Sequence, residues 1–341
     1  MSPSLSPRPK LQFNPRSSLG HQLLLILKGV FRAEHSRHQA KQRGDDGGFI
    51  FGISTMQDYT AVAFRFARYL KGKHQCRTPT DITPEMCEQF VQQKLREKCR
   101  GGTLGKYQAA LRKIDKAMRA LHLKPADAPE WLPPLERGGK RGFHASTSTE
   151  AYTPEASKSI LEFIIEHGSR KYAVVAVLVI RLMIATGLRI SEALYLKGDD
   201  IDIVARRISL NRDSAHPNRN HAKGGRSRVT MEFGEEELPL MRELHERARQ
   251  NSTGHIFDNR RSLANHVRED IRRACRALNI EPLGTHAFRK RNAQDLHAKL
   301  MSEGVSDQAA RAQVSRHLGH NRLRVINESY VPPQDRRSQA S

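Results

Sequence analysis

The chain has 341 residues, which is enough for about two domains at roughly 150 residues each. Its 58 Lys and Arg residues outnumber 36 Asp and Glu residues, which gives a net charge of +22 and a sequence pI near 10.3. A charge of this size favours a polyanionic partner, with nucleic acid ahead of an anionic membrane surface, over a soluble protein that is basic by chance.

Cysteine usage and hydropathy exclude several classes of protein. The four cysteines form no CxxC pair and no dense disulfide framework, as expected of a reduced protein. The longest apolar run, residues 173–180, is far shorter than the roughly 20 residues that span a bilayer. The apolar stretch 23–27 is interrupted by Lys28 and has no small-residue cleavage site after it. We therefore expect a cytoplasmic, nucleoid-associated protein.

Residues 1–50 have the composition of a basic, largely disordered arm. The first 20 are rich in Ser, Pro and Arg, and the apolar patch 23–31 is compatible with a short helix. Up to Gly48 there are eight Lys and Arg residues against three Asp and Glu residues. The arm is equally well explained as a floppy terminus and as a source of extra phosphate contacts.

Residues 51–122 have the apolar spacing of a small helical domain. Thr83 followed by Pro84 is typical of a helix start, and Thr103 is expected to cap a third helix. The polar faces carry many Lys and Arg residues, which suits a module that grips phosphates but also an ordinary solvated surface. Prolines and a Gly-, Arg- and Lys-rich run then predict a linker at residues 123–150.

A second domain is predicted at residues 151–331, with a tail at 332–341. Thr153 and Pro154 are typical of a capped helix start, and a strongly apolar helix is expected at 172–186. Two strand-like segments follow, at 206–210 and 227–233, and the remainder is mostly helical. The fold class is therefore mainly α with a small antiparallel β-sheet.

Residues 185–194 carry the most specific local signal. Gly187 ends one helix and Arg189 opens the next between two apolar neighbours, so we expect its guanidinium to be drawn inward. A partly buried guanidinium needs a carboxylate or a phosphate as its partner. Glu192, three residues on, can brace it, and a simple helix ion pair would explain the two residues equally well.

This segment, Thr-Gly-Leu-Arg-Ile-Ser-Glu at 186–192, resembles the first conserved box of the tyrosine recombinases, the integrase family. That family uses an Arg, a Lys in a strand turn, a His-x-x-Arg, a His or Trp after Leu-Gly, and a nucleophilic Tyr. The matching residues here, in chain order, are Arg189, Lys223, His286, Arg289, His320 and Tyr330. Four His-x-x-Arg patterns occur in the chain, but only the one at His286 lies downstream of Lys223.

The resemblance covers residues 152–331 and implies a role for each matching residue. Breaking a phosphodiester without a metal requires fixed donors on its non-bridging oxygens, which Arg189 and Arg289 would supply. His286 and His320 would be further donors or proton carriers, while Lys223 would protonate the departing 5′ oxygen. Tyr330 would be the nucleophile, since a phenol with a pKa of about 10 can be activated by nearby positive charge.

The family also implies the architecture and the partners. Residues 51–122 would be a helical core-binding domain of the SAM-like kind, and 151–331 the catalytic domain. Together they would close around double-stranded DNA and act as a homotetramer on two recombination sites, with accessory DNA-bending or directionality factors as further candidate partners. No metal and no cofactor is expected, and a zinc site at His317 and His320 is disfavoured because a suitable third ligand is missing.

Two features depart from the family pattern or leave alternatives open. The interval from Arg289 to His320 is about two helical turns longer than expected, so we predict an inserted loop at 301–311. Arg219, Arg226 and Arg228 are expected to contact phosphates near Lys223, and a solvated turn is the alternative. His317 is expected to be a polar helix residue.

Three functions fit the pattern. The first is a site-specific recombinase of a mobile element (phage, integrative element or transposon), which the small helical domain, the basic arm and the insertion favour. The second is an inactive DNA-binding protein of the same fold, against which the complete set of six residues argues. The third is a type IB topoisomerase-like enzyme that nicks and reseals DNA.

Overall fold

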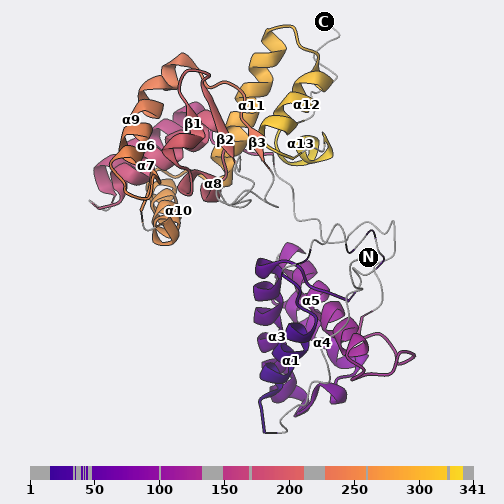
Figure 1. Cartoon of the computed structure of the whole chain (residues 1–341). Helices are drawn as coiled ribbons and strands as arrows, with labels where there is room; N and C mark the ends of the chain where they lie inside the picture. The colour runs from indigo at the N-terminus through magenta and orange to yellow at the C-terminus, as the bar shows by residue number, and fades with distance from the viewer. Residues whose placement is uncertain are drawn as a thin grey trace, which may run out of the picture. The chain divides into compact units, whose positions relative to one another are not determined.

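The computed structural model describes residues 16–33, 35, 40, 42, 44, 48–99, 101–132, 149–168, 171–210, 227–258, 260–320 and 323–332. The chain divides into two units, Met1–Ser146 and Thr147–Ser341, which are coloured indigo to magenta and magenta to yellow in Figure 1. Within the described part of the chain, no helix is long and apolar enough to cross a membrane.

The first unit is a bundle of helices around one apolar cluster. Thr83 caps its helix as predicted, because its hydroxyl accepts a hydrogen bond from the Met86 amide at 3.4 Å. Thr103 does not cap, since its helix already begins two residues earlier. The elements are α1 (Leu19–Gly29), α3 (Ile53–His74), the 3-10 turn η1 (Pro79–Asp81), α4 (Pro84–Arg96) and α5 (Gly101–Ala120).

Two predicted boundaries of this unit are wrong. α1 buries Leu23, Ile26 and Leu27 completely, so it belongs to the bundle and not to a disordered arm of residues 1–50. At the other end, Trp131 is 1% exposed and its amide donates to Asp115 Oδ2 at 3.3 Å. Residues 123–132, the first ten of the predicted linker 123–150, therefore belong to the first unit. In both segments a few large apolar side chains outweigh the polar or proline-rich composition around them.

The second unit contains helices around a three-stranded antiparallel sheet of order β1-β2-β3, which confirms the predicted fold class. Ile201 pairs with Ile208, and Ser209 pairs with Val229. The elements are α6 (Pro154–His167), α7 (Ala173–Thr186), α8 (Ile190–Leu194), η2 (Gly198–Asp200), β1 (Ile201–Asp202), β2 (Arg207–Leu210), β3 (Arg228–Val229), η4 (Glu235–Glu237), α9 (Leu238–Arg249), α10 (Arg260–Ala277), α11 (His286–Ser302), α12 (Asp307–His317) and α13 (Leu323–Ser329).

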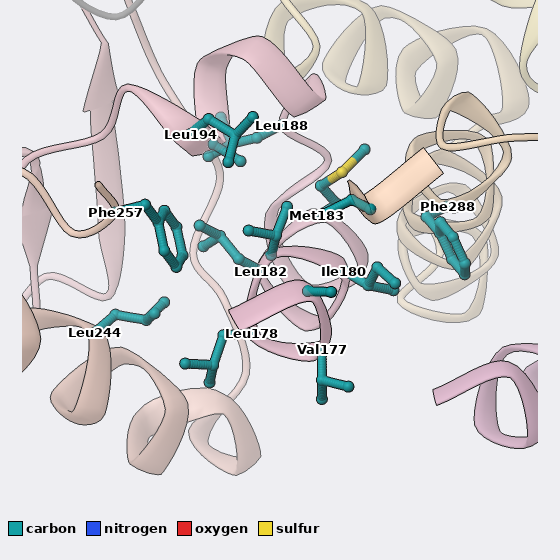
Figure 2. Close-up of a cluster of buried hydrophobic side chains, with 14 of the residues drawn as sticks. Val177, Leu178, Ile180, Leu182, Met183, Leu188, Leu194, Leu244, Phe257 and Phe288 are labelled. Atoms are coloured by element: carbon teal, nitrogen blue, oxygen red, sulfur yellow. The ribbon is translucent and has the colours of Figure 1, made fainter. Parts of the chain in front are cut away.

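Helix α7 lies at the centre of this unit. It is apolar on nearly every side, as expected of a helix surrounded by others, and it contacts α6, α9, α10 and α11. Figure 2 shows its Val177, Ile180 and Leu182 among side chains from other elements, including Leu244 and Phe257. A rigid core therefore supports the Gly187 turn that follows α7.

A separate apolar cluster joins α11, α12 and α13, and the inserted loop predicted at 301–311 is wrong. α11 continues to Ser302 and α12 begins at Asp307, so only a four-residue turn separates the two helices. Gly304, at φ +83°, provides the left-handed conformation that this turn needs. Ala310 and Val314 of α12 are buried in the apolar cluster shared with α11 and α13, so this part of the predicted loop is a packed helix.

Candidate active site

The hydroxyl of Tyr330 is the meeting point of the candidate site. Tyr330 follows α13 directly and is 2% exposed. Its oxygen lies 2.9 Å from His286 Nε2, 3.0 Å from His320 Nε2 and 3.2 Å from Arg289 Nε. Three residues, which lie 10 to 44 positions before Tyr330 in the sequence, therefore surround its phenolic oxygen.

The donors and acceptors around the Tyr330 hydroxyl give His286 and His320 different hydrogen-bonding roles. The Tyr330 hydroxyl has one proton to donate, and Arg289 Nε can only donate to it. One histidine must therefore accept the phenolic proton, and the other can donate. Arg289 Nη2 lies 3.5 Å from His320 Nε2. Because a guanidinium never accepts, this contact favours His320 as the acceptor and His286 as the donor.

Arg289 is completely buried, and backbone carbonyls fix the plane of its guanidinium. Nη1 donates to the carbonyl of Gly187, and Nη2 donates to the carbonyl of Leu318 at 2.6 Å. Burial lowers the pKa of Arg289 to about 10, although the nearby Tyr330 and Glu192 act in the opposite direction. The group therefore stays protonated at neutral pH and holds a fixed positive charge beside the hydroxyl.

Glu192 is the electrostatic centre behind the site. It is 0% exposed, and its carboxylate accepts from Arg189 Nη1 at 2.6 Å and from Arg228 Nη1 and Nη2 at 3.0 and 2.8 Å. Arg289 Nη1 lies 3.5 Å away. Burial alone would raise the pKa of Glu192, but the hydrogen bonds and charges of the arginines, Arg228 first, lower it to about 2. One carboxylate thus faces three guanidiniums and leaves a net positive pocket.

Both histidines are kept neutral by the same surroundings. Desolvation, followed by the charge of Arg289, lowers the pKa of His286 to about 4 and that of His320 to about 3. Each imidazole is therefore neutral at neutral pH and keeps one ring nitrogen that can accept a proton. A neutral imidazole can accept a phenolic proton, whereas an imidazolium cannot.

A hydrogen-bond network around His317, which the sequence did not predict, supports the site. His317 is 4% exposed, accepts from the Met231 amide at 2.9 Å through Nδ1, and lies 3.0 Å from Asn292 Oδ1 through Nε2. Asn292 in turn donates to the carbonyl of Ile184 at 2.9 Å. Desolvation, with the charges of Arg289 and Arg228, lowers the pKa of His317 to about 3. The network ties the residues after β3 to α12, α11 and α7.

The structure thus brings together five of the six predicted residues. His286, Arg289 and His320 contact Tyr330 directly, and Arg189 joins them through Glu192. Lys223 lies outside the described residues, as do Arg219 and Arg226. Arg228, which was expected to contact phosphate, instead directs both of its Nη atoms to Glu192. In the described ranges, no group of three or more His, Cys, Asp or Glu residues is placed to hold a metal ion.

This fold and this site define a class of protein. The model of the phage integrase family matches residues 151–337, which is more than half of the chain. The chain therefore belongs to the phage integrase family, the tyrosine recombinases. No curated protein sequence matches it.

Solved structures share the fold at low sequence identity. A XerH site-specific recombinase bound to a palindromic difH substrate, in a post-cleavage complex, superposes with a TM-score of 0.61 at 17% identity, over 94% of each chain. The Tn1549 transposon integrase in complex with transposon right end DNA gives 0.55 at 16% identity, over 93% of this chain and 98% of that one. A λ integrase tetramer bound to a Holliday junction gives 0.55 at 14% identity, over 88% and 79%.

Proposed function

We propose that the protein is a site-specific recombinase of a mobile element, which cuts and rejoins double-stranded DNA through a 3′-phosphotyrosyl intermediate. The observation that carries the proposal is the contact of the Tyr330 hydroxyl with Arg289 and two neutral histidines in a pocket of net positive charge. The DNA named with the XerH, Tn1549 and λ proteins supports DNA as the substrate.

The proposed reaction is an exchange of phosphodiester bonds. The Tyr330 oxygen attacks the phosphorus, its proton passes to His320, and the bond from phosphorus to the 5′ oxygen breaks. Arg189 and Arg289 hold the non-bridging oxygens, where negative charge grows in the transition state. Lys223 protonates the departing 5′ oxygen. A 5′ hydroxyl from another strand then attacks the phosphotyrosine, which restores the phenol and rejoins the DNA.

The first unit supports the same substrate. Met1–Ser146 carries 26 Lys and Arg residues against 12 Asp and Glu residues, and the second unit carries 32 against 24. Both units are thus positively charged, as a protein that contacts DNA phosphates with two domains should be. We propose that the first unit is the core-binding domain and that four copies act on two sites, as the tetramer of the λ integrase structure suggests.

The test is a suicide-substrate assay without metal. A nicked duplex taken from the ends of the element that carries the gene is incubated with the protein, and adducts are resolved on a denaturing gel. We expect a covalent adduct with the wild type and none with Tyr330→Phe. Tyr172→Phe is the matched control, because Tyr172 stacks on His266 away from the site and should leave the adduct unchanged.

Each other outcome points to a different function. Tight binding of the duplex without an adduct would favour the inactive DNA-binding protein. An adduct that reseals the same strand and never exchanges strands between two sites would favour the topoisomerase-like enzyme. An adduct that persists in Tyr330→Phe would contradict the assignment of the nucleophile.

A further inference from the structure

The chain just beyond α13 is held by backbone hydrogen bonds to that helix and also by side chains. The amides of Tyr330 and Val331 both donate to the Ile326 carbonyl at 3.0 Å. Three successive carbonyls, those of Tyr330, Val331 and Pro332, each accept a side-chain hydrogen bond. Gln294 Nε2 donates to the Tyr330 carbonyl at 2.9 Å. Arg311 donates to the other two, from Nη1 to Val331 and from Nη2 to Pro332, both at 3.0 Å. We call Gln294 and Arg311 the carbonyl clamp.

Arg311 is a buried cation whose donors are directed at this segment. It lies on α12 and is 7% exposed. Its Nη1 also reaches Asn327 Oδ1 on α13 at 3.3 Å. A guanidinium removed from water needs its hydrogen bonds satisfied in the protein, and the Nη donors of Arg311 are satisfied while α13 and the segment after it stay in place.

An ion pair with Asp307 fixes Arg311 itself. Asp307, one turn earlier on α12, accepts from Arg311 Nε at 2.9 and 2.8 Å through its two oxygens. His297 of α11, which is 7% exposed, lies 2.9 Å from the same carboxylate. The hydrogen bond from Arg311 comes first among the causes that lower the pKa of Asp307. Asp307 of α12 and His297 of α11 therefore orient the guanidinium independently of its contacts with the carbonyls.

The carbonyl clamp lies where it can fix the position of Tyr330. α13 has seven residues, which is too short to be stable alone. The nucleophile stands one residue after it, and only a narrow range of positions puts its oxygen near the attack distance. The Tyr330 oxygen contacts residues of α11 and His320, which follows α12. The clamp ties the Tyr330 carbonyl to α11 and the Val331 carbonyl to α12.

We propose that Arg311 is a positioning residue for the nucleophile: together with Gln294 it fixes the backbone at residues 330–332 so that the Tyr330 hydroxyl stays on Arg289 and the two histidines. The proposal rests on the proposed function, in which Tyr330 attacks the phosphate. Arg311 contacts neither the hydroxyl nor its partners, so it acts on the hydroxyl through α13 and the backbone that follows it.

The experiment compares Arg311→Met with Arg316→Met in the full chain. Arg316 lies on the same helix and is exposed, so it controls for the loss of one positive charge on α12. Three quantities are measured: binding of the nicked duplex, the single-turnover rate of adduct formation at saturating protein, and amide hydrogen exchange of residues 326–332 without DNA. Arg311→Lys and Gln294→Met are measured alongside.

For Arg311→Met we expect unchanged binding, adduct formation slower by about 100-fold, and faster exchange at residues 326–332. Arg311→Lys, which can still reach one carbonyl, should recover part of the rate, and Arg316→Met should resemble the wild type. Gln294→Met removes the hydrogen bond to the Tyr330 carbonyl, and one to the Thr149 carbonyl, without touching a buried charge. It should therefore show a smaller loss of the same kind even if Arg311→Met folds poorly.

Other results would overturn the proposal. A normal rate of adduct formation in both Arg311→Met and Gln294→Met would mean that the clamp is not needed. Equal losses of binding and rate would mean that Arg311 only maintains the fold. If the wild type forms no adduct, the proposed function fails. The exchange data then decide separately whether the clamp holds the segment, and unchanged exchange at 326–332 would reject it.

Discussion

At the scale of single residues, Glu192 determines how the positive charge of the site is arranged. Its carboxylate is completely buried and accepts hydrogen bonds from Arg189 and Arg228, while Arg289 lies within 3.5 Å. Without this charge, the three guanidiniums would repel one another in a region of low dielectric. Glu192 therefore stabilises the fold and also orients Arg189 and Arg289, the two arginines that we propose to hold the phosphate.

We predict that Glu192→Gln destabilises the protein and stops cleavage. Removing one partner of a buried ion pair costs about 3–5 kcal/mol, because the other charge remains buried. The thermal unfolding midpoint should fall, and the adduct should disappear at a temperature where the variant is still folded. Glu269→Gln is the control, since Glu269 pairs with Arg272 and Arg276 on the surface of α10 and should change the midpoint little. Equal shifts in the two variants would contradict this role.

The buried His317 predicts a loss of stability in acid. Its folded pKa of about 3 lies below the value of about 6.5 expected when unfolded. The stabilisation is therefore complete above about pH 6.5 and is lost as the pH falls toward 3. The slope from this histidine approaches about 1.4 kcal/mol per pH unit. Unfolding midpoints measured from pH 7.5 to 4.5 should fall for the wild type and fall less steeply for His317→Gln. Parallel curves would reject the assignment.

At the scale of elements, the short turn between α7 and α8 connects the core to the site. Gly187 has φ +63°, and its carbonyl accepts from the buried Arg289. A Cβ atom at this position would collide with Asn292 Oδ1 and lie 3.0 Å from His317 Nε2. The left-handed conformation and the crowding therefore both require glycine here.

We predict that Gly187→Ala lowers stability by clearly more than Gly254→Ala. Gly254 has φ +67°, but a Cβ atom there would meet nothing within 4 Å, so alanine should cost only the backbone strain of about 1 kcal/mol. At Gly187 the collision adds to that cost and displaces the carbonyl that orients Arg289. Thermal unfolding and adduct formation measure the two effects, and equal midpoints for both variants would contradict the argument.

The elements also show which parts of the structure could be predicted from sequence. The apolar run of α7, the Thr83 and Thr153 caps and the Arg189 box are local signals, and they placed their elements correctly. The roles of His317 and Arg311 could not be predicted, because their partners lie far away: Met231 is 86 residues from His317, and Val331 is 20 residues from Arg311. Only the packing of α11 against α12 and α13 creates those contacts.

At the scale of the whole molecule, charge is the property that sequence fixes most directly. The net charge of +22 is divided over both units, since Lys and Arg exceed Asp and Glu in each. Several arginines of the second unit are already paired within it, among them Arg228 and Arg311. DNA binding should therefore draw on many separate exposed cations, and no single one should dominate the affinity.

We predict that the DNA affinity falls steeply with salt concentration, and that it does so equally in a variant that cannot cleave DNA. Each neutralised phosphate contributes a slope of about −0.9 to the plot of log K against log salt, so six to ten contacts would weaken binding by about 10³–10⁵ between 50 and 200 mM salt. Fluorescence anisotropy with a labelled duplex measures this slope. Tyr330→Phe should leave it unchanged because no charge is lost, and Arg189→Met should reduce it by about 1 at most. A shallow slope for the wild type would mean that the positive charge serves a different partner, whereas a large change in Tyr330→Phe would mean that the buried hydroxyl helps to shape the DNA-binding surface.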